Sequence, residues 1–423
     1  MTNSSNPLRL EYGRAIDGLR VVRQPAPVGA ASFSATYVGP AGSGFDPPGE
    51  EGIARLVNQL MTVAAGRYRR IELARRLDRA GALLSHETSP EAGEVTIWGP
   101  AGDWKSLVGL LGEVVRSPRF DPDDIARLQR QFLERQMRER TQPASRADLE
   151  MLHAIYPRGH PYRSTGLGDR RSITRLPRQR LIRFHRDHYT SDGGLLVVTT
   201  AAPLSAVEEA AMDVFAGFSA AKGPRLRVPT LGRTAPQRRT IPLAGRSQVE
   251  IRLGGPSIPQ SAPEYVGAYL ANEVLGGRPL LSRLFQRVRE RNGLAYHSSS
   301  HLETMRFGGI WSARAGTGAD RWRRVVPMLV QEVERLRRET VPLRELNTIR
   351  KSAIGEVPLA LESTAEAHEL AVDVSYHGLA EDYLVRWPAR LRAVTPADVR
   401  EAARSAFDRN HSVTVVAGPV DPR

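Results

Sequence analysis

The chain contains two long segments that resemble each other. LPRQRLIRFHRDHYTSDGGLLVVTTAAP spans Leu176 to Pro203, and VTPADVREAARSAFDRNHSVTVVAGPV spans Val394 to Val420. Each reads as a turn with a proline, an amphipathic helix, a short polar loop and an apolar strand that ends in small residues. A repeat of this length predicts two similar domains, and not a solenoid of short units. The 423 residues are also too many for one ordinary core.

The two halves begin alike as well. LRVVRQPAPVGAASFSATYVGP and RRTIPLAGRSQVEIRLGGP both read as strands of alternating apolar residues that end at Gly-Pro turns. The stretch from Ala220 to Arg239 is rich in proline, glycine and arginine, which is typical of a loop. We therefore expect domains at 1–222 and 241–423, joined by a linker at 223–240.

Helices and strands mix within each half. Helical spacing in the first half occurs at Gly52–Val63, Arg70–Ala80, Gly102–Val115, Asp121–Thr141, Arg146–Ile155, Arg178–His188 and Leu204–Phe218. Apolar strands such as Glu94–Trp98 and Leu195–Thr199 lie between them. This order predicts an α+β fold in which helices pack on one face of a mostly antiparallel sheet.

The composition is that of a globular protein, with 41% apolar and 25% charged residues. No apolar run approaches the ~20 residues that cross a bilayer, and the first residues do not have the pattern of a signal peptide. The absence of cysteine excludes disulfides, thiol nucleophiles and thiolate metal sites. We expect a cytoplasmic protein that does not bind membranes.

The net charge of +14 comes almost entirely from arginine. Such a charge suits an acidic peptide or an acidic partner chain, and the sequence does not decide between them. Segments such as RYRRIELARRLDRAG alternate arginine with acidic residues at helical spacing, which is also typical of solvated helices. Aromatic residues are not interleaved with a basic stripe, so we expect no nucleic-acid binding.

Four segments, in this order, resemble the landmarks of the M16 metallopeptidases, the group of pitrilysin, insulinase and mitochondrial processing peptidase. They are GFDPPGEEGIARLVNQLM, ELARRLDRAGALLSHETSPE, HPYRSTGLGDRRSITRL and GRPLLSRLFQRVRERNGLAYHS. The resemblance runs from about Leu10 to Val420. It implies two homologous α/β-roll domains of the processing-peptidase type, which form half of a clamshell.

In that family, the helix at Gly52–Met61 carries the zinc motif His-x-x-Glu-His. Here Arg55, Asn58 and Gln59 stand at the three motif positions, and the family's third ligand falls near Glu134. Amides compete poorly for zinc, arginine is always charged, and no general base remains. The resemblance therefore implies an abandoned metal site with no zinc in this chain. A pairing of Arg55 with Glu134 and a solvent-exposed Arg55 both remain open.

Other histidines do not replace that site. His185 and His188 form an H-x-x-H pair, and His368 precedes Glu369, but neither has the spacing of a zinc-peptidase motif. We interpret them as ordinary surface or capping histidines, and His160 of HPYR as structural.

The second half retains an Arg/Tyr pair, Arg289 and Tyr296, within RERNGLAYHS. In the family, these two residues come from the half without zinc and contact the substrate over the metal. The tyrosine hydroxyl donates to the oxyanion, and the arginine binds a neighbouring carbonyl. The alternative is that Arg289 caps a helix and Tyr296 fills a core.

The family binds an extended peptide along a sheet edge, which corresponds here to Gly81–Ser89. The substrate-binding positions are then Leu84, Ser85 and His86, although the family usually has Asn-Ala where this chain has Ser85 and His86.

These features resemble the non-catalytic subunit of a heterodimeric bacterial M16 zinc endopeptidase. Such a chain is not a peptidase by itself. It supplies Arg289 and Tyr296 to a partner subunit that carries His-x-x-Glu-His and its zinc, and helps enclose a peptide substrate. One alternative is a catalytically inert peptide-binding or scaffold protein of the same fold. Another is an enzyme that holds zinc through a different cluster.

Overall fold

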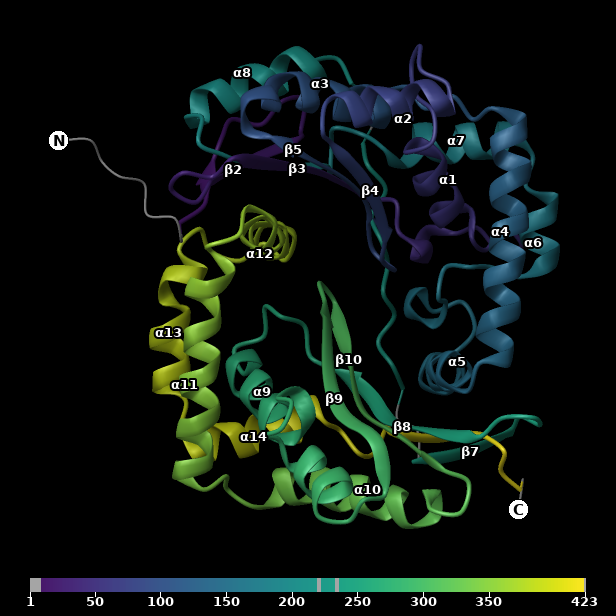
Figure 1. The fold of residues 1–423 in the computed structure, drawn as a ribbon, viewed down its shortest axis with the longest axis vertical. Helices are drawn as coiled ribbons and strands as arrows, with labels where there is room; N and C mark the ends of the chain where they lie inside the picture. Colours follow the sequence, from purple (N-terminus) through teal and green to yellow (C-terminus); the bar gives the residue numbers. More distant parts are fainter. Residues whose placement is uncertain (1–8, 219–221, 233–235, 422–423) are drawn as a thin grey trace. The chain divides into compact units, whose positions relative to one another are not determined.

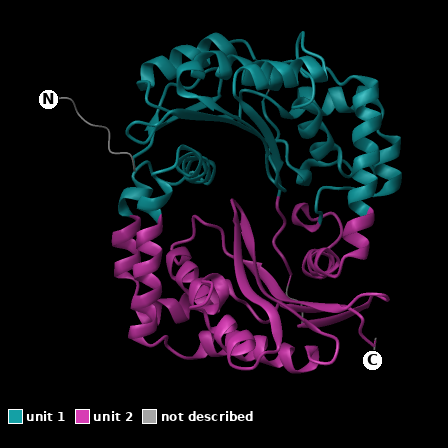
Figure 2. Ribbon diagram, in the orientation of Figure 1, with its two compact units in different colours: residues 1–136, 164–227, 357–386 teal, residues 137–163, 228–356, 387–423 magenta. Residues whose placement is uncertain are grey.

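A computed structural model describes residues 9–218, 222–232 and 236–421. The chain divides into two compact units (Figure 2). Unit 1 consists of residues 1–136, 164–227 and 357–386, and unit 2 of residues 137–163, 228–356 and 387–423. Within the described ranges, no helix combines the length and apolar character that a membrane span requires.

Unit 1 is built on a six-stranded sheet in the order β1-β2-β6-β3-β5-β4 (Figure 1). Its strands are β1 (Glu11–Tyr12), β2 (Arg20–Pro25), β3 (Ser32–Gly39), β4 (Leu83–Thr88), β5 (Gly93–Pro100) and β6 (Leu195–Thr200). Strands β2 and β6 run parallel, and the other described pairs run antiparallel.

One face of this sheet carries the main core of unit 1. Phe33, Ala35 and Tyr37 alternate along β3 and are fully buried, and Tyr37 stacks on Phe215 with 5.9 Å between ring centroids. The helices that the first half of the chain contributes to this unit are α1 (Ile53–Met61), α2 (Arg70–Arg79), α3 (Trp104–Arg116), α4 (Pro122–Thr141), α6 (Arg170–Arg175), α7 (Arg178–His188) and α8 (Leu204–Phe215), with α4 ending in unit 2.

Unit 2 contains a five-stranded sheet in the order β7-β11-β8-β10-β9. Its strands are β7 (Gln237–Pro242), β8 (Gln248–Ser257), β9 (Ala295–Met305), β10 (Gly308–Gly318) and β11 (Val413–Gly418). The remaining helices of the second half are α9 (Tyr265–Asn272), α10 (Trp322–Arg338), α11 (Leu343–Ala360), α12 (Thr364–Tyr376), α13 (Tyr383–Ala393) and α14 (Pro396–Ala406). Two π-helical segments, Glu273–Gly277 and Phe285–Glu290, follow α9.

The two sheets share one topology. The order β2-β6-β3-β5-β4 corresponds to β7-β11-β8-β10-β9, and β7 and β11 run parallel as β2 and β6 do. The repeated sequence segments form α7 with β6 and α14 with β11. The prediction of two homologous α+β domains with mostly antiparallel sheets is therefore confirmed.

The compact units do not coincide with the sequence halves 1–222 and 241–423. Helix α12 packs on β2, β3 and β6 of unit 1, and α5 (Pro143–Ile155) packs on β7, β8 and β11 of unit 2. Each sheet thus has its second face covered by a helix from the other half. Of the predicted linker and its surroundings, residues 219–221 and 233–235 lie outside the described residues.

Candidate functional site

Helix α1 is fixed by its apolar stripe and by its N-terminus. Ile53, Leu56, Val57, Leu60 and Met61 are all buried, as the i, i+3, i+4 spacing predicts. Asp46 accepts hydrogen bonds from the amides of Gly52 (2.7 Å) and Ala54 (3.0 Å), which satisfies donors at the helix start. Burial raises the pKa of Asp46 to about 7. Gly52 has φ of +97°, and a Cβ there would lie 2.6 Å from Ile173.

Two of the three polar side chains of α1 at the motif positions, those of Arg55 and Asn58, donate hydrogen bonds within the protein. Arg55 donates from Nη1 to the carbonyl oxygen of Thr165 at 2.8 Å. Asn58 is fully buried and donates from Nδ2 to the carbonyl oxygen of Glu87 and, at 3.0 Å, to Thr88 Oγ1. The side-chain oxygens of Asn58 and Gln59 are buried with no hydrogen-bond partner among the described residues. Asn58 therefore ties α1 to β4.

Helix α4 presents a different residue to this region than the sequence suggests. Glu134 is exposed, and within the described residues it forms no ion pair with Arg55, so the pairing considered from the sequence is wrong. Gln136 continues the buried stripe of Ile125, Leu128 and Phe132, and donates to the carbonyl oxygen of Leu167 at 2.8 Å. Glu134, two residues earlier, lies on the opposite, exposed face of α4.

The backbone segment 165–168 connects Gln136 of α4 with helix α1. A Cβ on Gly52 would lie 3.1 Å from backbone atoms of Leu167 and Gly168, so this segment lies against the start of α1. The same segment accepts the hydrogen bonds of Arg55 and Gln136. Gln136 is the residue that sequence reasoning missed. Its place four residues after Phe132 on the apolar stripe was the available signal.

Strand β4, the predicted peptide-binding edge, lies at the edge of its sheet and pairs with β5 among the described strands. Leu84 packs against the core, and His86 lies beside Thr62 with 3.2 Å between Nδ1 and Oγ1. Burial lowers the pKa of His86 to about 4, and the guanidinium groups of Arg135 and Arg55 add to this effect. Ser85 points to the opposite face of the sheet, because side chains alternate along a strand.

The residues around α1 do not fit zinc. The relevant positions offer a guanidinium and the amides of Asn58, Gln59 and Gln136, whereas zinc is bound by histidine, cysteine and carboxylates. His86 is neutral near pH 7 but lies close to two guanidinium groups, which repel a divalent ion. Across the described ranges, no group of three or more His, Asp or Glu side chains is arranged to hold a metal.

The other histidines considered from the sequence have structural contacts. His185 Nε2 lies 2.7 Å from the carbonyl oxygen of Val115, and His188 Nδ1 lies 2.9 Å from that of Phe184. His368 lies between Thr36 Oγ1 (2.6 Å from Nε2) and Thr199 Oγ1 (2.8 Å from Nδ1), so both ring nitrogens are occupied.

His160 and Glu369 are the other two residues that the sequence analysis considered as a replacement for the site on α1. His160 is buried, accepts a hydrogen bond from the amide of Tyr162 at 3.1 Å and stacks on Tyr156 with 4.5 Å between centroids. Glu369 is exposed on α12. Neither residue lies in a group that could hold a metal within the described part of the chain.

The Arg/Tyr pair of unit 2 is accessible. Arg289 lies in the last turn of the second π-helical segment, is exposed, and places its guanidinium 5.2 Å from the ring centroid of Phe285. Tyr296 lies on the edge strand β9, and its side chain is 60% exposed. The alternative that Tyr296 fills a core is therefore wrong. Its hydroxyl has no hydrogen-bond partner among the described residues.

The turn between Arg289 and Tyr296 requires glycine at one position. Gly293 has φ of +58°, which non-glycine residues rarely adopt. Its amide donates to the carbonyl oxygen of Arg289 at 2.9 Å, and the next amide, of Leu294, donates to Val288 at 3.0 Å. The arginine and the tyrosine thus flank one tight, hydrogen-bonded turn.

Two family models match the chain. The model described as insulinase (peptidase family M16) matches residues 20–170, and the model described as peptidase M16 inactive domain matches residues 175–353. Together with the duplicated fold, these matches identify the chain. It belongs to the M16 peptidase family.

Relatives include proteins named as proteases. The chain is 29% identical over 267 residues to an uncharacterized zinc protease of Streptomyces coelicolor, an alignment that covers 60% of this chain and 56% of that protein. It is 24% identical over 409 residues to an uncharacterized zinc protease of Mycobacterium tuberculosis, which covers 95% of this chain and 91% of that protein.

The fold also has a counterpart among solved structures. The crystal structure of a peptidase M16 inactive domain from Pseudomonas fluorescens matches with a TM-score of 0.90 at 21% identity. The match covers 98% of this chain and 99% of that one, so the whole described fold has a counterpart there.

Proposed function

We propose that this chain is the non-catalytic subunit of a two-chain M16 zinc endopeptidase. The observation that carries the proposal is a contrast between helix α1 of unit 1 and the Arg/Tyr pair of unit 2. On unit 1, the motif side chains Arg55 and Asn58 are used in internal hydrogen bonds. On unit 2, Arg289 and Tyr296 are exposed, and the tyrosine hydroxyl is available to an external partner.

In this proposal, the partner subunit carries His-x-x-Glu-His and the zinc, which activates the attacking water. Attack on the peptide carbonyl produces an oxyanion, and the hydroxyl of Tyr296 donates a hydrogen bond to it. The guanidinium of Arg289 donates to a neighbouring carbonyl of the substrate and so holds the peptide in register. Neither role requires a metal in this chain.

Strand β4 supplies the second part of the proposed role, which is peptide binding. An edge strand can add an extended peptide through main-chain hydrogen bonds. Leu84 and His86 point toward α1, and Ser85 points the other way, so a bound peptide would meet side chains of both faces. His86, held neutral by burial, adds no charge to this edge near pH 7.

A scaffold protein that holds peptides without cleaving them is the second candidate. The observation in its favour is the same loss of zinc ligands on α1, because such a role needs the fold and the edge strand but no chemistry. It gives no role to the exposed hydroxyl of Tyr296.

The test is reconstitution. The tagged chain is purified from extract of its native cell, and proteins that bind in stoichiometric amount are identified by mass spectrometry. Each chain alone and the mixture are then assayed on quenched fluorescent peptides. We expect a partner with His-x-x-Glu-His and cleavage by the mixture only. Cleavage by this chain alone, or a partner without that motif, would contradict the proposal.

A further inference from the structure

Tyr296 is the extra residue of a β-bulge. In the pairing of β9 with β10, Ala295 lies opposite Thr317 and His297 lies opposite Gly316, so Tyr296 has no partner in the register. A bulge bends its strand and redirects a side chain, and bulges are frequent beside active sites. Because the ring is largely exposed, packing does not fix its direction. The backbone on either side of Tyr296 must do so.

The side before the bulge is anchored to β10 and to the start of α10. Thr317 donates from Oγ1 to the carbonyl oxygen of Leu294, and Arg321 donates from Nη1 to that of Gly293 at 3.1 Å. These bonds hold the two residues that precede Ala295.

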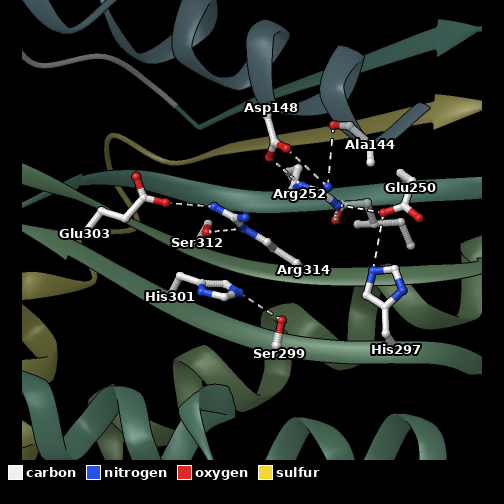
Figure 3. A network of polar contacts seen from close by, with 11 residues as sticks. Ala144, Asp148, Glu250, Arg252, His297, Ser299, His301, Glu303, Ser312 and Arg314 are labelled. Atoms are coloured by element: carbon white, nitrogen blue, oxygen red, sulfur yellow. Dashed lines mark hydrogen bonds and ion pairs between the residues drawn. The ribbon is translucent and has the colours of Figure 1, made fainter. Parts of the chain in front are cut away.

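The side after the bulge pairs with β10 through its backbone, and the side chain of His297 adds a second anchor there. Its Nε2 lies 3.4 Å from Oε2 of Glu250 on β8, so the imidazole crosses the intervening strand β10 (Figure 3). It crosses at Gly316, where a Cβ would lie 2.3 Å from His297 Cε1 and 2.8 Å from Glu250 Oε1. Glycine at this position is therefore what permits the contact.

Glu250 is a rigid anchor for this imidazole. Its side chain is 8% exposed, and Arg252, which is 4% exposed, donates to it at 2.9 Å and to Asp148 of α5 at 2.6 Å. Burial alone would raise the pKa of Glu250, but the hydrogen bonds from His297 and Arg252 lower it below its usual value. The carboxylate thus stays charged and fixed at neutral pH.

We propose that His297 is a positioning residue, which holds the bulge through its contact with Glu250 and so aims Tyr296. This inference rests on the proposed function of Tyr296 for its catalytic consequence, but the contact itself belongs to unit 2 alone. Gly316 contributes to this positioning, because it leaves room for the imidazole ring of His297.

The first test measures the bulge in the isolated chain. Amide hydrogen exchange of the segment around Ala295 to Ser298 is followed by mass spectrometry in His297→Ala, Gly316→Ala and His301→Ala. His301 is the matched control, since it lies on the same strand and its Nε2 contacts Ser299 Oγ at 3.1 Å. We expect at least roughly tenfold faster exchange in the first two variants and no change in the control. Unchanged exchange in His297→Ala would overturn the proposal.

The second test uses the reconstituted pair and separates positioning from general damage. His297→Ala should lower kcat at least roughly fivefold with KM unchanged, and the double variant with Tyr296→Phe should be no slower than Tyr296→Phe alone. Additive losses would overturn the positioning role. If Tyr296→Phe has no effect, the proposed function fails, and the exchange measurement still decides whether His297 holds the bulge.

Discussion

Arg55 donates a hydrogen bond to the carbonyl oxygen of Thr165 at 2.8 Å, and this contact fixes a permanent positive charge beside helix α1. The same backbone segment accepts a hydrogen bond from Gln136 of α4 at the carbonyl oxygen of Leu167. This part of unit 1 is thus held together by amides and a guanidinium.

We expect the isolated chain to purify without stoichiometric zinc, because none of these groups is a competent ligand. The combined variant Arg55→His, Asn58→Glu, Gln59→His and Gln136→Glu should gain one zinc per chain, measured by plasma mass spectrometry after dialysis. The matched control keeps Gln136 and relies on the native Glu134, and it should bind zinc at least roughly tenfold more weakly. Equal affinity would show that Glu134 can reach the metal. One zinc per wild-type chain would refute the abandoned site.

Asn58 should now contribute to stability. Asn58→Ala removes the donor to the Glu87 carbonyl inside the protein and should lower the free energy of unfolding by about 1–3 kcal/mol. Gln59→Ala, next to it on α1, should cost less than about 0.5 kcal/mol, because the Gln59 side-chain oxygen is already unpaired in the described structure. Urea unfolding followed by circular dichroism measures both. Equal losses would contradict this account of α1.

His368 should make the chain sensitive to acid. Burial lowers its pKa in the folded chain to about 3, against an ordinary value of 6.5. The unfolded chain therefore takes up the proton first, and stability falls as the pH drops below about 6.5. The loss from this residue should be about 2 kcal/mol between pH ~7 and ~5. His368→Leu should be less stable at neutral pH but show a shallower fall of Tm in acid. An identical slope would show that His368 does not contribute.

Glu94 should make the free energy of unfolding depend on pH in the opposite direction. It lies opposite Glu87 in the β4–β5 register, and burial, with the charges of Glu87 and Asp373, raises its pKa to about 7. Its charged form therefore destabilises the fold, and this cost grows as the pH rises from about 4.5 to 7. Glu94→Gln should raise the free energy of unfolding by roughly 1–3 kcal/mol at pH ~8 and by much less at pH ~5. A gain that does not vary with pH would exclude this cause.

The sequence predicts the architecture well because the repeat and the helical spacing are local signals. Helices such as Arg178–His188 and strands such as Leu195–Thr200 form where the pattern places them. The exchange of α5 and α12 between the two sequence halves could not be predicted in this way. An apolar helix face indicates that a helix is buried, but it does not indicate against which sheet.

The candidate site could be predicted in part. The motif RERNGLAYHS indicates Arg289 and Tyr296, and both are exposed in the structure. The bulge at Tyr296 and the contact of His297 with Glu250 depend on cross-strand register, which no sequence period reports. The choice between Glu134 and Gln136 depends on which face of α4 is buried, and a register error of two residues reverses that face.

The central claim is that the hydroxyl of Tyr296 acts in a partner's active site. Its most direct test is the rate of peptide cleavage by the reconstituted pair with Tyr296→Phe, which removes one oxygen atom from an exposed ring and leaves the fold unaffected. We predict that assembly is unchanged and that kcat falls at least roughly tenfold, as loss of an oxyanion donor requires. A pair that assembles and cleaves at the wild-type rate would contradict the account.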